Sequence, residues 1–391
     1  MKGPIALCME YSLVQQGGTE VLVRALAEDL GQSLDVVLVT NDTPESLAAS
    51  GLKARLVRHI RWNPADQTRA RSRRLAAELQ ALGVQLAHFH FGGTFTWQNR
   101  WPGACPIHHV RRRGIRCVST VHLVHPPLGG YIGDQRSLGT KLALFPLAWG
   151  AKCGTLKLTE LEFAVSRHDL AILQGCCGPL AARQRSMYHS AIRTDELPEG
   201  PEVREPVILC VGSIGPRKGQ VILIEAFNRI AAQCPDWRLV MVGRWEEGHY
   251  YQSVRAAIDA SPHRKRIEMP GRLPDAETRA WLRRASIFAM PSLEEGLGLS
   301  LQEALLSGCP AVGSRAGGIP ELIDDGSNGR LVTPGDPQAL AGGLAELIRQ
   351  PESRLRLARQ ARESVLRKGM TREAMIANYL EAYNEVLGGS R

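Results

Sequence analysis

Short, mainly apolar runs alternate with helical patterns along the first half of the chain. Five such runs have the length and composition of buried strands, and they span residues 5–9, 36–39, 86–89, 117–121 and 163–165. Between several of them, as at residues 20–30 and 71–82, apolar residues recur every three or four positions, which predicts amphipathic helices. This alternation favours an α/β fold in which a parallel sheet carries helices on both faces.

The same alternation starts again in the second half. Residues 194–206 are rich in proline and acidic residues and predict a linker, after which a new apolar run begins at Val207. At 391 residues the chain exceeds the usual size of one domain, so we expect two domains of similar type. The chain ends in a predicted amphipathic helix, whose apolar positions are Ile376, Tyr379, Leu380, Tyr383 and Leu387.

Residues 285–312 carry the strongest functional signal. An apolar run at 285–290 predicts a strand, Gly296 and Gly298 predict a turn, residues 299–306 predict a helix, and a second apolar run follows at 309–312. This order predicts a parallel β-α-β unit. The first N–H groups of its helix have no partner inside the helix and favour phosphate, and the glycines allow a ligand to approach the backbone closely.

Two acids, Glu295 and Glu303, lie eight positions apart across this predicted turn and helix. Eight helical residues span roughly 12 Å, which is about the reach from a sugar across a diphosphate to a ribose. Glu295 could therefore hold sugar hydroxyls, and Glu303 the ribose hydroxyls. The alternative is that each acid is ordinary in a helix, where a negative charge in the first turn suits the helix dipole.

This stretch resembles the E-x(7)-E signature of the family-four retaining glycosyltransferases, which have the GT-B fold. Other segments resemble that family in the same order, and they span residues 211–227, 239–244, 268–277 and 314–336. The resemblance covers nearly all of residues 205–350 and continues more weakly over the first half. It implies two Rossmann-like domains facing across a cleft: residues 1–195 would bind the acceptor, residues 196–370 the nucleotide sugar, and the helix of residues 371–391 would return to the N-terminal domain.

The resemblance also implies roles for individual residues. Glu295, Lys218 and His122 are expected to be catalytic, with His122 near the reaction centre and His90 and His125 as further candidates. A histidine at the end of a strand is also often only structural. The residues expected to bind the nucleotide sugar are Gly17, Gly18, Ser213, Arg217, Lys218, Arg272, Glu295, Gly296, Leu297, Gly298, Leu299 and Glu303.

One position departs from the family pattern. Members of the family usually carry an arginine five residues before the lysine that corresponds to Lys218, and this chain has Ser213 there. Arg217 is expected to replace that arginine in part, because its planar guanidinium suits phosphate oxygens. Lys218 would stabilise the departing diphosphate; the less favoured alternative is a solvated pair of cations in a loop. Gly17 and Gly18 follow the first strand, where a glycine pair can wrap a phosphate or a sugar or can form a plain turn.

The net charge of +9 lies in one half of the chain. Residues 1–195 contain 23 Lys and Arg against 14 Asp and Glu, whereas residues 196–391 contain 25 of each kind. Two arginine clusters, at residues 69–74 and 111–116, would attract an anionic membrane surface or a lipid-phosphate acceptor, or they form solvated helix faces. We expect no nucleic-acid partner, because no stacking aromatics are interleaved with these clusters.

Several motifs and segments that the sequence lacks narrow the expected class of protein. The nine cysteines show no metal-binding spacing, and their scatter fits reduced thiols. No secretory signal and no apolar run of membrane-spanning length occurs. The longest apolar stretch, residues 142–151, is expected to be buried or interfacial. We therefore expect a cytoplasmic protein, peripheral on the inner face of a membrane at most, with no cofactor and no metal ion.

The predicted function is a retaining transfer of a hexose from a nucleoside-diphosphate sugar to an acceptor hydroxyl, in the synthesis of glycans, glycolipids or cell-surface polysaccharides. Same-face displacement and a covalent intermediate both remain open. The alternatives are a nucleotide- or polyanion-binding protein without activity, and an epimerase or phosphorylase on the same scaffold.

Overall fold

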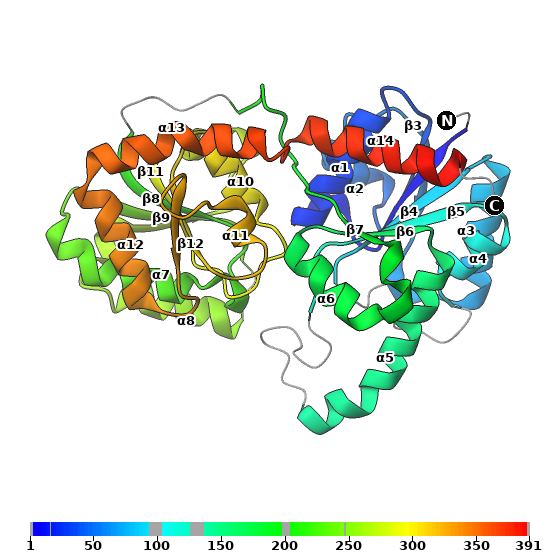
Figure 1. Ribbon diagram of the computed structural model, residues 1–391, viewed down its shortest axis with the longest axis horizontal. Helices are drawn as coiled ribbons and strands as arrows, with labels where there is room; N and C mark the ends of the chain where they lie inside the picture. Colours follow the sequence, from blue (N-terminus) through cyan, green and yellow to red (C-terminus); the bar gives the residue numbers. More distant parts are fainter. Residues whose placement is uncertain are drawn as a thin grey trace. The chain divides into compact units, whose positions relative to one another are not determined.

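The computed structural model describes residues 3–15, 17–93, 104–125, 137–197, 204–245 and 248–388 (Figure 1). The chain divides into two compact units. Unit 1 comprises Met1–Ala191 and Arg372–Arg391, and unit 2 comprises Ile192–Thr371. Each unit is built around a single parallel sheet with helices on both faces, which is the Rossmann-like arrangement that the sequence predicts.

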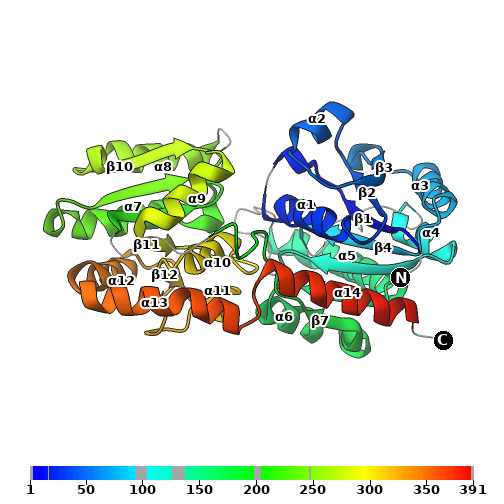
Figure 2. The same cartoon turned by 90° about the horizontal axis from the view of Figure 1, so that it is seen from above.

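Unit 1 contains a seven-stranded parallel sheet in the order β3-β2-β1-β4-β5-β6-β7. Its strands are β1 (Ile5–Met9), β2 (Val36–Thr40), β3 (Leu56–Arg61), β4 (Leu86–Phe91), β5 (Arg116–Val121), β6 (Leu161–Ala164) and β7 (Gln184–Ser186). Its helices are α1 (Gly18–Leu30), α2 (Pro44–Ala49), α3 (Arg69–Ala81), α4 (Pro106–Arg112), α5 (Leu138–Leu158), α6 (Arg167–Cys177) and α14 (Arg372–Gly388). Apolar side chains of α3, α4 and α6 pack on one face of this sheet, while α1 and α14 lie together on the other (Figure 2).

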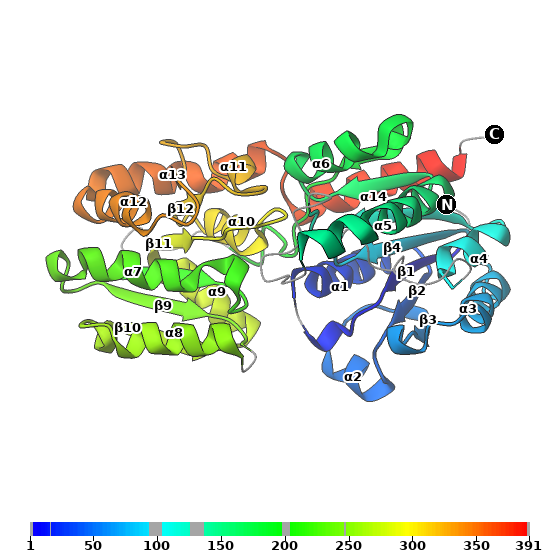
Figure 3. The same ribbon diagram turned by 90° about the horizontal axis from the view of Figure 1, so that it is seen from below.

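Unit 2 contains a six-stranded parallel sheet in the order β10-β9-β8-β11-β12-β13. Its strands are β8 (Glu205–Val211), β9 (Arg238–Val242), β10 (Ile267–Gly271), β11 (Ala285–Met290), β12 (Ala311–Ser314) and β13 (Gly329–Val332). Its helices are α7 (Gln220–Ile230), α8 (His249–Asp259), α9 (Asp275–Arg284), α10 (Leu299–Leu306), α11 (Ile319–Leu322), α12 (Pro337–Arg349) and α13 (Pro351–Arg367). Helices α7, α8 and α12 bury their apolar faces against one side of the sheet (Figure 3).

The last helix returns to the N-terminal sheet, as predicted. Tyr379 and Tyr383, both buried, lie on the predicted apolar face of α14, whereas Ile376, Leu380 and Leu387 are only partly buried. Tyr383 hydrogen bonds with His88 of β4 at 2.6 Å, and Tyr379 with Thr120 of β5 at 2.9 Å. These bonds attach α14 to the middle of the sheet.

Most predicted elements are confirmed, but of the two environments expected for residues 142–151, buried or interfacial, burial is wrong. The strand at 285–290 and the helix at 299–306 have the predicted bounds, whereas the strand expected at 309–312 begins two residues later, as β12. Residues 142–151 belong to α5, but they are not buried, because Leu142, Leu144 and Leu147 are all exposed. The predicted linker at 194–206 falls partly outside the described residues.

Candidate active site

Three strands of unit 2 end in glycine at the carboxyl edge of the sheet. Gly212 follows β8, Gly243 follows β9 and Gly271 ends β10. A Cβ atom on Gly243 would lie 1.9 Å from the carbonyl oxygen of Gly212, so no other residue fits there without movement of the backbone. The sheet edge is therefore lined by main chain, which suits the binding of a ligand in an open α/β sheet.

The loop of residues 291–298 follows β11 at this edge and is held by two neighbouring loops. On one side, the N–H of Leu293 donates to the carbonyl oxygen of Arg217 at 2.7 Å, and a Cβ on Gly219 would lie 2.3 Å from the carbonyl oxygen of Pro291. On the other side, the N–H of Gly318 donates to the carbonyl oxygen of Glu295 at 3.1 Å. The main chain at Glu295 is thereby fixed from both directions.

Helix α10 starts directly after this loop. Gly298 precedes it in a left-handed conformation with φ of 103°, and among the described residues no side chain caps its first N–H groups. The hydroxyl of Ser300 donates to the carbonyl oxygen of Val211 at 2.8 Å, which anchors the first turn to β8. The backbone that is predicted to contact the ligand therefore lies at an uncapped helix start, which attracts anions. It comprises Gly296, Leu297, Gly298 and Leu299.

Glu295 lies between two cations. Its Oε2 is 2.5 Å from Nζ of Lys218 and 3.6 Å from a guanidinium nitrogen of Arg217, and it accepts a hydrogen bond of 3.4 Å from the hydroxyl of Ser292. Burial alone would raise the pKa of this carboxyl, but Lys218, Arg217 and the hydrogen bonds outweigh it and hold the pKa below its ordinary value. The three residues that the sequence predicts around the diphosphate thus lie together.

Glu303 has the opposite electrostatic character. It lies on α10, partly buried, near Asp275 and Arg279 of α9. Burial and the nearby Asp275 raise the pKa of Glu303 to about 8, although Arg279 opposes the shift. At neutral pH the carboxyl is therefore mostly protonated when no ligand is bound.

Two further predicted residues, Ser213 and Arg272, lie at the same sheet edge. Ser213 is exposed, and its carbonyl oxygen accepts a hydrogen bond of 3.0 Å from the amide of Gln220. Arg272 is exposed directly after β10. Their side chains are accessible, and their predicted ligand contacts stay predictions.

The remaining candidates lie in unit 1. Gly17 precedes α1 and Gly18 is its first residue; a Cβ on Gly17 would lie 2.5 Å from a carboxylate oxygen of Glu20. His122 follows β5, and its Nε2 hydrogen bonds with Nδ1 of His90 at 3.1 Å, so the two predicted histidines are neighbours. Burial lowers the pKa of His122 to about 3, which keeps its imidazole neutral at physiological pH.

Comparison with known proteins identifies the family. Residues 193–364 match the model for glycosyl transferases group 1, and residues 16–185 match the model for Glycosyltransferase Family 4, so that the two together account for most of the chain. The chain belongs to glycosyltransferase family four.

One curated family-four relative is the GDP-mannose-dependent alpha-(1-6)-phosphatidylinositol monomannoside mannosyltransferase of Mycolicibacterium smegmatis. It is 28% identical over 205 residues, which cover 48% of this chain and 52% of the relative. A second is the putative colanic acid biosynthesis glycosyltransferase WcaL of Salmonella typhimurium, which is 35% identical over 40% of each chain. The chain spans about half the length, or less, of the curated relatives that it matches.

Solved structures confirm the GT-B fold over the whole chain. The sucrose-phosphate synthase of Thermosynechococcus elongatus superimposes with a TM-score of 0.77 at 19% identity and covers 100% of both chains. At 19% identity, such similarity establishes the fold alone. The confirmed architecture is the family-four one of two Rossmann-like domains, with the C-terminal helix returning to the first.

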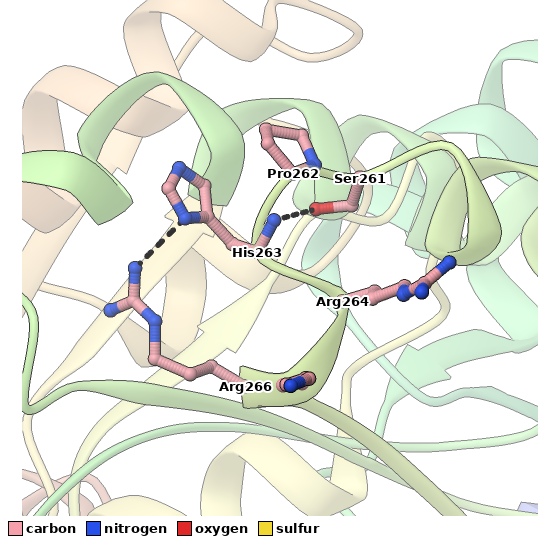
Figure 4. Close-up of a pocket in the computed structure, with 6 residues that line it drawn as sticks. Ser261, Pro262, His263, Arg264 and Arg266 are labelled. Carbon is pink, nitrogen blue, oxygen red and sulfur yellow. Dashed lines mark hydrogen bonds between the residues drawn. The ribbon is translucent and has the colours of Figure 1, made fainter.

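A separate hollow at residues 261–266 does not belong to this site (Figure 4). It lies before β10, at the amino edge of the sheet, whereas Gly271 lies at the carboxyl edge. Arg266 donates hydrogen bonds there to the carbonyl oxygens of Ala231, Cys234 and Trp237. The arginine therefore ties two loops together, and the hollow has a structural explanation.

No role was predicted from the sequence for two residues that shape the candidate site. Gly317 has φ of 53°, and a Cβ there would lie 1.7 Å from the carbonyl oxygen of Glu295. Trp245, after β9, covers Gly271, where a Cβ would lie 2.6 Å from the indole, and it stacks on Tyr251 at 5.5 Å. The two adjacent glycines at 317–318, within a segment that resembles the family, were the only signal for the first of these contacts.

Proposed function

We propose that this protein is a retaining hexosyltransferase that uses a nucleoside-diphosphate sugar as donor. The observation that carries the proposal is the pairing of Glu295 with Lys218 and Arg217 beside the uncapped start of α10. Two cations contact one carboxylate there, and α10, whose first N–H groups have no side-chain cap among the described residues, begins four residues later. A diphosphate offers the same charge with more acceptor oxygens, so it can compete for the same groups.

Donor binding would rearrange these contacts. Lys218 and Arg217 would turn from Glu295 to the diphosphate, and the released carboxylate would accept hydrogen bonds from sugar hydroxyls. Glu303 would lose its proton and accept two hydrogen bonds from the ribose. The cations stabilise the charge that develops as the C1–oxygen bond to the diphosphate breaks, which is the largest demand of the reaction.

The transfer itself needs no metal ion in this proposal. The acceptor oxygen forms the new bond to C1 on the same face from which the diphosphate departs, and the acceptor proton passes to the departing phosphate oxygen. Lys218, Arg217 and the N–H groups of α10 supply the positive charge that a divalent cation would otherwise provide. We assign acceptor binding to unit 1 and a catalytic role to His122.

The names of similar proteins support this donor and acceptor class. One curated relative is named as dependent on GDP-mannose and as acting on a phosphatidylinositol mannoside. A structural neighbour, the Anabaena protein HepE, was solved in complex with UDP-glucose, with a TM-score of 0.74 at 18% identity over 98% of this chain and 99% of the neighbour. We therefore propose a glycan or a lipid-linked sugar as the acceptor.

The decisive experiment measures nucleotide binding and sugar release. UDP, GDP and their common hexose derivatives should be screened for an increase in melting temperature, because a ligand of the native state stabilises it. The best nucleotide sugar should then be assayed for transfer or slow hydrolysis with EDTA present. Lys218→Ala should lower kcat/KM by more than about tenfold, as expected for loss of a charge that acts in the transition state.

Lys265→Ala is the matched control, because Lys265 is an exposed lysine of the same unit at the opposite sheet edge. It should leave kcat/KM unchanged. Full activity of the Lys218 variant, or an absolute requirement for Mn²⁺, would contradict the proposal. A melting shift without any release or transfer of sugar would show a nucleotide-binding protein instead.

A further inference from the structure

The first half of α5 exposes an unusual amount of apolar surface. The exposed fractions of Leu138, Leu142, Leu144 and Leu147 are 64%, 51%, 42% and 73%. These leucines account for four of the six large exposed apolar residues among those that the structure describes. Buried residues of the helix begin only at Lys152, Thr155 and Leu156. Figure 1 shows this first half extending away from the sheet of its own unit.

This surface is not the buried stripe of an ordinary amphipathic helix. Leu138 and Leu142 share one side of the helix, whereas Leu147 lies on the other, so apolar side chains point outward in several directions. Helices that are apolar all round are found inside proteins or in membranes. Because these leucines are exposed to water in the folded unit, the environment that fits them is apolar and lies outside the described chain.

The length and composition of the apolar segment indicate what that environment is. Residues 142–151 contain no charge; Lys141 precedes them, whereas Lys152, which follows them, is buried and pairs with Glu162. Ten helical residues span about 15 Å, which is half of the roughly 30 Å hydrocarbon core of a bilayer. Among the described residues no helix has both the length and the apolar content needed to cross a membrane. Phe145 and Trp149 stack on each other at 5.9 Å within the segment, and Trp favours the interface between lipid and water.

Two other helices of unit 1, α3 and α4, carry positive charge. Helix α4 packs on both α3 and α5, and a hollow between α3 and α4 is lined by Arg73, Arg112 and Arg113. We call these three residues the arginine patch. None of them forms an ion pair with an acid among the residues that the structure describes; Arg113 donates to the neutral side chain of Gln80 at 2.6 Å. Guanidinium groups without an acidic partner attract anionic headgroups.

We propose that unit 1 binds peripherally to an anionic phospholipid bilayer, with the first half of α5 embedded in the interface and the arginine patch attracting the headgroups. An apolar segment and a polybasic patch are the two signals that stable peripheral attachment needs. A second copy of this chain fits the same surface less well, because the excess charge of +9 lies entirely in residues 1–195 and two such halves would repel each other. The surface is independent of the nucleotide-sugar site.

Vesicle co-sedimentation tests the proposal directly. The full chain should sediment with vesicles of phosphatidylcholine and phosphatidylglycerol, should bind vesicles of phosphatidylcholine alone weakly, and should be released by salt. The double variant Leu142→Gln, Leu147→Gln should bind at least about tenfold more weakly, because two embedded leucines are lost while helix propensity is kept. Arg73→Gln with Arg112→Gln should weaken binding to the anionic vesicles and reduce its salt dependence.

Two matched controls lie in unit 2. Leu366→Gln removes a leucine of α13 that is 43% exposed, and Arg264→Gln with Lys265→Gln removes two exposed charges. Both should bind vesicles like the natural sequence. A chain that stays in the supernatant with anionic vesicles would overturn the proposal, as would equal binding by the leucine variant. So would a dimer in light scattering without lipid that the leucine substitutions convert to a monomer, since α5 would then be a self-association surface.

Discussion

At the scale of single residues, Gly317 excludes any side chain from the space that the main chain of Glu295 occupies. Its φ of 53° lies in the left-handed region, and a Cβ would lie 1.7 Å from the carbonyl oxygen of Glu295. A left-handed conformation costs an ordinary residue roughly 1–2 kcal/mol even without a clash. The position of Glu295 therefore depends on a glycine more than twenty residues away in sequence.

We expect Gly317→Ala to destabilise the protein by more than about 2 kcal/mol and to weaken nucleotide-sugar binding, since the loop of residues 291–298 must move. Gly342→Ala is the matched control, because Gly342 lies in α12 with open space around its Cβ position. That change should be neutral or stabilising by up to about 1 kcal/mol, from helix propensity. Denaturant unfolding of both variants makes the comparison, and equal stability of the two would refute the steric argument.

Glu303 makes the stability of unit 2 depend on pH. Its pKa of about 8 in the folded protein exceeds the ordinary value for a glutamate, so the folded state holds this proton more tightly than the unfolded state does. The resulting stabilisation is complete below the unfolded pKa of about 4.3 and is lost as the pH rises through 8. It changes by at most about 1.4 kcal/mol per pH unit.

The free energy of unfolding of the natural sequence should therefore fall between pH 5 and pH 8, relative to that of Glu303→Gln, which keeps a neutral side chain throughout. Urea unfolding across this range measures the difference. Parallel curves for the two proteins would show that Glu303 has an ordinary pKa and is already ionised at neutral pH.

At the scale of elements, α14 is attached to the N-terminal sheet through buried histidines that are neutral when folded. Burial lowers the pKa of His88 and of His122 to about 3, and it holds those of His90 and His189 well below the ordinary value. Tyr383 hydrogen bonds with His88, and Tyr379 with His189 at 2.6 Å. In an unfolded chain the same histidines take up protons below about pH 6.5.

Acidification should consequently release α14. The stabilisation is present above pH 6.5 and is lost as the pH falls towards 3, because the unfolded state binds the additional protons. Hydrogen-exchange protection of the α14 amides, corrected for the intrinsic rate, should drop from pH 7.5 to pH 5. The drop should be smaller in His88→Gln and unchanged in His249→Gln, a substitution of an exposed histidine in unit 2. Constant protection across this range would show that the four histidines titrate normally.

Elements with a clear apolar period were predictable, whereas contacts between distant loops were not. Residues 285–290 are buried at every position and give the continuous apolar run that marks a strand of a parallel sheet. The edge strand β3 was missed because only Ile60 among its six residues is buried, so its sequence reads as polar. Burial, one of the two environments expected for residues 142–151, was wrong, because an apolar run does not by itself show whether a helix packs in a core.

In the candidate site, too, contacts between loops that are distant in sequence were not predictable. The sequence predicts that Glu295, Lys218 and Arg217 belong to one nucleotide-sugar site, and both cations do lie beside Glu295. The ion pairs between them were not predicted. It gives no sign that Gly317 presses on Glu295, because that contact joins two loops after different strands. It also gives no sign of the raised pKa of Glu303, which depends on the burial of one helix against another.

At the scale of the whole molecule, the two units differ in how the chain builds them. Unit 2 is continuous, from Ile192 to Thr371, and has its own sheet and core. Arg362 of α13 donates to the carbonyl oxygens of Thr194 and Leu197, which holds the start of the unit against its end. Unit 1 is discontinuous, because Arg372 begins a helix that packs on the first 191 residues. Unit 1 is therefore built from two separate segments of the chain, whereas unit 2 is built from one.

This difference predicts how each unit behaves alone. A fragment of residues 192–371 should unfold cooperatively, and its melting temperature should rise with the same nucleoside diphosphate as that of the full chain. Lys218→Ala should reduce that rise.

Residues 1–191 should aggregate, since without α14 the hydrogen-bonding groups of His88 and Thr120 lose the partners that cover them. Adding residues 372–391 as a peptide should restore a soluble, cooperatively unfolding unit, because it returns Tyr379, Tyr383 and the ion pair of Arg372 with Asp29. A stable, monomeric fragment of residues 1–191 would show that the sheet of unit 1 does not need α14. A fragment of residues 192–371 that melts without cooperativity would show that unit 2 depends on contacts outside its own core.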